Sequence, residues 1–98
     1  MFLETAVRAL QEAKCLNLSY DGYERLVEVH LIGRDKNDQP IMLVWQISGG
    51  SATGERVGWK ALRLQDARNA ELIEIASQAP RSGYSRQNNA IKTVTHYL

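Results

Sequence analysis

Near the N-terminus the hydrophobic residues recur every three or four positions. They are Leu3, Ala6, Val7, Leu10 and Ala13, with charged or amide residues between them. This spacing predicts an amphipathic helix of about three turns over residues 2–14. Because so short a helix is marginal by itself, we expect its apolar stripe to pack on one end of the structure that follows.

After Cys15 the period changes to two. Apolar and polar residues alternate over residues 16–20, and Asp21-Gly22 is typical of a tight hairpin turn. A second alternating segment spans residues 24–34. The pattern therefore predicts an antiparallel hairpin directly after the helix.

Three more segments have the character of strands. Pro40 opens a nearly continuous apolar run over residues 41–47, typical of a strand covered on both faces, and residues 57–64 and 70–76 follow after turns. A helix followed by five short strands predicts a mainly β fold, and we expect a small five-stranded Sm-like or SH3-like barrel. An OB barrel is the closest alternative.

Composition divides the chain into three parts. Residues 1–14 are the predicted helix, residues 15–78 the predicted barrel, and residues 79–98 a basic C-terminal extension, since no acidic residue follows Glu74. We expect this extension to be partly ordered. Its apolar residues are compatible with one more strand or a short helix.

Length and charge limit the function. The 98 residues, 44% of them hydrophobic, form one core. A formal net charge of +1 excludes a general field that would attract nucleic acid or an anionic membrane, so binding must come from a local patch. The single cysteine, Cys15, excludes an internal disulfide and indicates a reducing, cytoplasmic setting. No segment reaches twenty apolar residues, and we expect no association with a membrane.

The first hairpin carries three candidate ligand-binding residues, Tyr20, Arg25 and His30. Strict alternation places Arg25 on one face of its strand, and Glu28 with His30 on the other. A bulge near Val29 would reunite them. A regular strand would instead leave Glu28 and His30 as a solvent-facing pair, in which the carboxylate favours the charged imidazole.

Arg63 lies between Leu62 and Leu64, so its side chain either faces water or points into a cleft where it needs an anion. The surrounding segment, residues 56–68, is locally +3, which suits a phosphate-rich ligand and equally a solvated strand face. Its cations are Arg56, Lys60, Arg63 and Arg68.

Trp45 and Trp59 have apolar neighbours, which favours a place in the core over a role as stacking platforms. Gln46, beside Trp45, is a candidate polar contact to a ligand. The chain has no Gly-rich phosphate loop, no nucleophile elbow and no His-x-x-x-His motif. We therefore predict a non-enzyme with no catalytic residue, no cofactor and no metal site.

Several motifs, taken in order, resemble the WYL domain in a short stand-alone form. They are Leu-x-Leu-Ser-Tyr20, Arg25-Leu-Val-Glu-Val-His30, Gly33-Arg34, Leu43-x-Trp45-Gln46, Trp59-Lys60 and Leu62-Arg-Leu-Gln-Asp66. The resemblance covers about residues 15–75. Three positions differ: Ile41-Met42-Leu43 stands where the family has Trp-Tyr-Leu, Val29 replaces a proline, and Ala67 replaces a basic residue.

WYL domains are similar to Sm-like barrels and are typically prokaryotic. They usually serve as the sensory part of transcription regulators, where they bind a small anionic ligand or single-stranded nucleic acid. By this resemblance Tyr20, Arg25, His30 and Arg63 fall on ligand-site positions. With one predicted helix there is no room for a helix-turn-helix, so we expect any DNA-binding protein to be a separate partner.

A second class of function stays open, in which the chain is an interaction protein. An exposed strand edge would then assemble with a partner or into a homo-oligomer, and the arginines would merely be solvated. Clustering of Arg25, His30 and Arg63 in one concavity favours ligand sensing, whereas their dispersal favours assembly.

Overall fold

The N-terminal helix forms where the apolar spacing predicts it. In the computed structural model, which describes all 98 residues, α1 spans Leu3–Glu12 and buries Ala6, Ala9 and Leu10. Ala13 ends the helix in the left-handed region, with φ 53° and its N–H donating to the carbonyl of Ala9. The change of hydrophobic period after Ala13 is thus a helix end followed at once by a strand.

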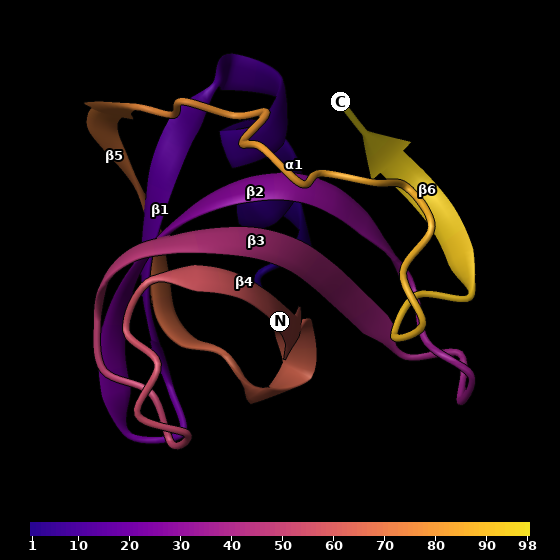
Figure 1. The fold of residues 1–98 in the computed structure, drawn as a ribbon, viewed down its shortest axis with the longest axis horizontal. Helices are drawn as coiled ribbons and strands as arrows, with labels where there is room; N and C mark the ends of the chain where they lie inside the picture. The colour runs from indigo at the N-terminus through magenta and orange to yellow at the C-terminus, as the bar shows by residue number, and fades with distance from the viewer.

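Five antiparallel strands follow, in the sheet order β4-β3-β2-β1-β5 (Figure 1). They are β1 (Lys14–Tyr20), β2 (Tyr23–Arg34), β3 (Pro40–Gly49), β4 (Gly58–Arg63) and β5 (Arg68–Ala76). Asp21 and Gly22 have φ of 52° and 78°, as the tight hairpin turn requires. A short 3-10 helix, η1 (Leu64–Asp66), joins β4 to β5.

The sheet keeps two open edges, because no ladder of hydrogen bonds joins β4 to β5. The prediction of a mainly β fold with one N-terminal helix is confirmed, while closure into a barrel is not seen. No helix combines the length and the apolar composition that crossing a membrane requires.

A sixth strand, β6 (Thr93–Tyr97), comes from the C-terminal extension, which the sequence left open between a strand and a short helix. β2 is long enough to hold two partners along one edge. Its first part, up to Val27, pairs with β1, and Leu31–Arg34 pair with β6. A side chain at Gly33 would overlap the Thr93 carbonyl, so glycine permits the close approach of β6.

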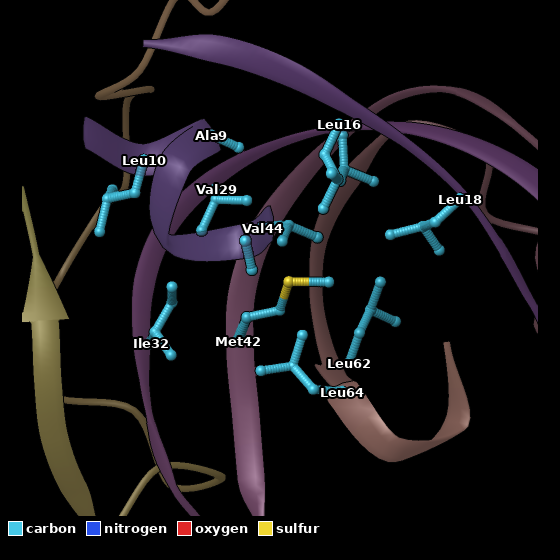
Figure 2. Packing of buried hydrophobic residues seen from close by; sticks show 12 residues of the cluster. Ala9, Leu10, Leu16, Leu18, Val29, Ile32, Met42, Val44, Leu62 and Leu64 are labelled. Atoms are coloured by element: carbon cyan, nitrogen blue, oxygen red, sulfur yellow. The ribbon is translucent and has the colours of Figure 1, made fainter. Parts of the chain in front are cut away.

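Two apolar clusters cover the two faces of the sheet. The larger lies between α1 and the sheet, on what we call the inner face (Figure 2). Its buried residues are Ala6, Ala9, Leu10, Leu16, Leu18, Val27, Val29, Ile32, Met42, Val44, Leu62 and Leu64. The smaller lies on the outer face and consists of Leu31, Ile41, Leu43 and Ile91.

Ile91 belongs to the segment between β5 and β6, so that segment covers part of the outer face. It crosses in front of β2 on its way from β5 to β6 (Figure 1). We call residues 77–92 the C-terminal strap.

Leu10→Ala should lower the free energy of unfolding by about 2–4 kcal/mol, because Leu10 is only 7% exposed in the inner cluster and its loss leaves a cavity. Chemical denaturation measures the change. Gln11→Ala, at the exposed neighbouring position, is the control. A loss of under about 0.5 kcal/mol for Leu10→Ala, the range of ordinary surface substitutions, would show that α1 is a loose appendage.

Candidate functional site

β2 has a bulge near Val29, one of the two arrangements that the sequence left open, and His30 is the extra residue. Val29 pairs with Val44 and Leu31 with Leu43, so no residue of β3 pairs with His30. The bulge does not reunite the predicted site. Arg25 contacts Tyr20 and Gln46, whereas the ring of His30 packs against Trp59 and Tyr84 beside the outer cluster.

Arg25 is an internal cation. It is 3% exposed, its Nη1 donates to Gln46 Oε1 (3.4 Å), and its Nη2 donates to the carbonyl of Tyr20 (3.1 Å). The guanidinium carbon lies 5.2 Å from the ring centre of Tyr20 and 5.8 Å from that of Tyr23. Its Nε has no partner, and it forms no ion pair with a carboxylate. Two π faces and two neutral oxygens therefore stabilise its charge.

Glu28 and His30 are both fully buried, so the expectation of a solvent-facing pair is wrong. The strap covers them. Glu28 Oε1 accepts a hydrogen bond from Arg81 Nε (2.6 Å), and Oε2 accepts from Arg81 Nη2 (3.2 Å) and from the backbone N–H of Gln78 (2.6 Å). This two-pronged ion pair satisfies the buried carboxylate. The hydrogen bond to Glu28 raises the pKa of Arg81.

The contacts of His30 define its tautomer. Its Nε2 accepts a hydrogen bond from the backbone N–H of Arg81 (2.9 Å), so the proton is on Nδ1, which donates to the carbonyl of Glu28 (3.0 Å). Burial lowers the pKa of His30, although its hydrogen bond to the Glu28 carbonyl and the Glu28 charge oppose this effect. The imidazole is thus neutral, and the charged form that the sequence suggested is wrong.

Both tryptophans lie on the outer face and are partly buried. Trp45 and Trp59 meet edge to face with ring centres 5.3 Å apart, and Arg81 lies 5.8 Å from the ring centre of Trp45. Tyr84 of the strap packs near Trp59, at 6.3 Å between ring centres. The strap therefore packs on the aromatic residues of the outer face. Their partly buried positions are close to the core role that the sequence favoured.

Arg63 borders the largest cavity, a groove of about 570 Å³. The lining residues are Asp35, Lys36, Ile41, Arg63, Asn89, Ala90 and Lys92. We call this cavity the Arg63 groove. Three of its residues are cationic and one is a carboxylate, so its lining is net positive, which favours an anionic occupant.

Hydrogen bonds to Asp35 and Tyr20 position Arg63. Its Nε donates to Asp35 Oδ2 (3.3 Å), and its backbone N–H donates to the hydroxyl of Tyr20 (3.1 Å). Asp35 is held in turn, since its Oδ1 accepts from the backbone N–H groups of Gln39 and Asn37. The Gln39 bond, then those of Asn37 and Arg63, lower the pKa of Asp35. The two terminal nitrogens of Arg63 make no hydrogen bond within the protein, and the side chain is 51% exposed.

The other predicted cations lie elsewhere. Arg56 lines a separate, smaller cavity of about 470 Å³ beside Tyr23. Arg68 is exposed and donates to the carbonyls of Gln65 and Ala67. Gln46 is fully buried and donates to the carbonyl of Gly50, besides accepting from Arg25. The candidates Tyr20, Arg25, His30 and Arg63 therefore do not share one concavity, although Tyr20 contacts both arginines.

Sequence reasoning missed the residues that complete the groove. Lys36 comes from the turn between β2 and β3, and Asn89 and Lys92 come from the strap. Their separation along the chain leaves no local signal. Only the basic character of residues 79–98 pointed toward one of them, Lys92.

Comparison with models of protein families, with curated proteins and with solved structures finds no match to this chain. No three His, Cys, Asp or Glu side chains are grouped as ligands for a metal ion.

Acidification should destabilise the protein through His30. Its folded pKa lies below the ordinary 6.5, so the unfolded chain binds more protons between those two values. The stability that the neutral ring contributes is present above about pH 6.5 and falls as the pH drops through the lowered pKa. Chemical denaturation at several pH values measures it.

The matched control is His30→Gln, which should flatten the pH dependence in that window. Asp35 titrates at lower pH, because its own pKa is lowered from 3.8. NMR of the ring nitrogens reads the tautomer directly. A proton on Nε2 at neutral pH would contradict the hydrogen bonding described above.

Proposed function

We propose that this chain is a non-enzymatic binding module that recognises an anionic small molecule, a nucleotide or single-stranded nucleic acid in the Arg63 groove. The single observation behind the proposal is the fork of Arg63, oriented by Asp35 while both terminal nitrogens are free of protein partners. An oriented guanidinium with two free prongs suits a phosphate or carboxylate.

The groove has the size and lining of a ligand site. Its volume of about 570 Å³ lies within the range of roughly 300–1,000 Å³ of small-molecule sites. Ile41 and Ala90 supply apolar surface, Asn89 an amide, and Lys36 and Lys92 further positive charge. Since Asp35 already accepts three hydrogen bonds, it repels an anion less than a free carboxylate would.

The resemblance to WYL domains supports a regulatory role. The strand order β4-β3-β2-β1-β5, with η1 joining its two edges, suits a partly open small barrel of the Sm-like or SH3-like kind. In this proposal the domain acts in the cytoplasm and passes the presence of its ligand to a separate DNA-binding protein in transcriptional regulation. The ligand site differs from the expected one, because it includes Arg63 but not the buried Arg25 or His30.

A second candidate function, assembly, has an observation in its favour. β5 pairs only with β1, most of its residues are exposed, and Ile75 is 50% exposed on this open edge. An unprotected edge can add a strand from another chain. The dispersal of Arg25, His30 and Arg63 also favours this candidate. Sedimentation over a range of concentrations tests self-assembly, because a monomer throughout would exclude it.

Arg63→Ala should weaken anion binding about ten- to a hundredfold, the equivalent of about 1.5–3 kcal/mol of charge-assisted hydrogen bonding, while the fold stays intact. Arg63→Lys should recover little of it, because an ammonium lacks the fork. Calorimetric titration with inorganic phosphate, nucleoside monophosphates and a short oligothymidylate measures affinity.

Arg8→Ala is the matched control, because Arg8 is similarly exposed and also pairs through Nε with one carboxylate, Glu12. Melting temperatures of the same samples separate lost binding from lost folding. If Arg63→Ala and Arg8→Ala bind every anion as the unaltered protein does, the groove is not the site.

Arg25→Met should leave anion affinity unchanged, because Arg25 is buried and lines none of the cavities. It should cost about 1–3 kcal/mol of stability, since Gln46 loses a buried hydrogen-bond partner. Denaturation and the same titrations measure both quantities. A loss of affinity without a loss of stability would place the ligand at Arg25 instead.

A further inference from the structure

The Arg63 groove is completed by the strap. Asn89, Ala90 and Lys92 of the strap line it together with Asp35, Lys36 and Arg63 of the sheet and its β2–β3 turn. Lys92 is placed by its backbone N–H, which donates to the carbonyl of Arg34 at the end of β2 (2.8 Å). An anion in contact with both groups of residues would therefore bind most tightly while the strap is docked.

The strap is held by polar contacts and by a small apolar area, in which strap residues pack on the outer cluster and on Trp59. Of residues 77–92 only Ile91 is buried, and every other residue is partly or fully exposed. At its other end the strap is held by hydrogen bonds from Gln78 and Arg81 to Glu28 and His30. We call this set of bonds the latch. The larger cluster on the inner face includes no strap residue. A segment with so few apolar contacts can open without unfolding the rest.

We propose that the strap opens and closes as a unit, and that an anion in the groove and the latch hold it closed together. The proposal rests on the proposed function, since it assigns a regulation to the same groove. A ligand shifts such an equilibrium only by its preference for one state, and Asn89 and Lys92 supply that preference. Opening would expose Trp45, Trp59 and the outer cluster, so the anion would control access to an aromatic and apolar surface.

Linkage gives the size of the effect. If loss of the latch lowers the closed fraction to about one tenth, the apparent dissociation constant of a groove ligand rises about tenfold, although the groove residues are untouched. Conversely, a ligand that binds only the closed strap should, at about ten times its dissociation constant, lower the ratio of open to closed strap roughly elevenfold.

The test uses the full chain with Arg81→Gln, which removes the ion pair to Glu28 and keeps a polar side chain at a partly exposed position. Amide hydrogen exchange by NMR reports opening at Gln78, at residue 81 and at Lys92, whose N–H groups donate to β2 residues in the docked strap. Amides of β2 and β3 on the sheet are the internal reference. Arg86→Gln is the matched control, because Arg86 lies in the same strap but contacts Tyr97 and the Leu98 carbonyl.

We expect Arg81→Gln to speed exchange of the strap amides by at least about tenfold with the sheet amides unchanged, and to weaken binding of adenosine 5′-monophosphate about tenfold. Arg86→Gln should change neither. Exchange that accelerates equally in strap and sheet would overturn the proposal, because the strap would then open only by global unfolding.

The second part of the test adds adenosine 5′-monophosphate to the protein. In the unaltered protein it should shift the amide signals of Lys36 and Lys92 and slow exchange along the strap. Shifts at those amides with no change in strap exchange would overturn the linkage and leave the proposed function standing. Fast strap exchange in Arg81→Gln without any shift at Lys36 or Lys92 would instead overturn the groove as the site, and the linkage with it.

Discussion

Strand β2 is buried on both faces, so its polar side chains must find hydrogen-bond partners inside the molecule. Its inner face carries Val27, Val29 and Ile32 into the cluster under α1, and its outer face carries Glu28 and His30. A buried carboxylate and a buried imidazole both need hydrogen-bond partners. Strand β3 does not supply them. The strap supplies them through Arg81 and Gln78, and the course of the strap after β5 depends on these bonds.

The bulge at His30 sets the division between the two faces. With one extra residue in β2, Val29 and Ile32 share the inner cluster although they are three positions apart, and Leu31 turns to the outer cluster. The second half of β2 can then pair with β6 while its outer side chains meet the strap. The same path brings Lys92 beside Arg63, so the groove is a consequence of how the outer face is covered.

Arg25 and Arg81 show two ways to hold a charge in a small domain, the first fully buried and the second partly buried. Arg25 is stabilised by the faces of Tyr20 and Tyr23 and by neutral oxygens. Arg81 is paired with a carboxylate that is itself fully buried. Removing one partner of the second kind leaves an uncompensated charge, which costs far more than the pair contributes. The strap contacts are therefore specific, even though few of them are apolar.

Local patterns in the sequence determined most of the fold. The helical period gave way to alternation at Cys15, Asp21-Gly22 predicted the hairpin turn, and the five strands that follow lie close to their expected ranges, because period and turn chemistry act over a few residues. Arg63 was recognised as a cation that either faces water or lies in a cleft where it needs an anion. Its partner Asp35 and its neighbours Lys36, Asn89 and Lys92 could not be, since they come from distant segments.

Only the tertiary structure decided which polar residues meet. Alternation assigned Glu28 and His30 to one face of the strand but did not show whether that face is exposed to solvent. The face is buried because a segment fifty residues later in the chain covers it. Burial favours the neutral form of His30 over the charged form that the sequence suggested, because desolvation outweighs the effect of the nearby carboxylate on its pKa. A sequence determines the direction of each side chain along a strand through local geometry. The surroundings of that side chain are determined by long-range packing, which no local pattern records.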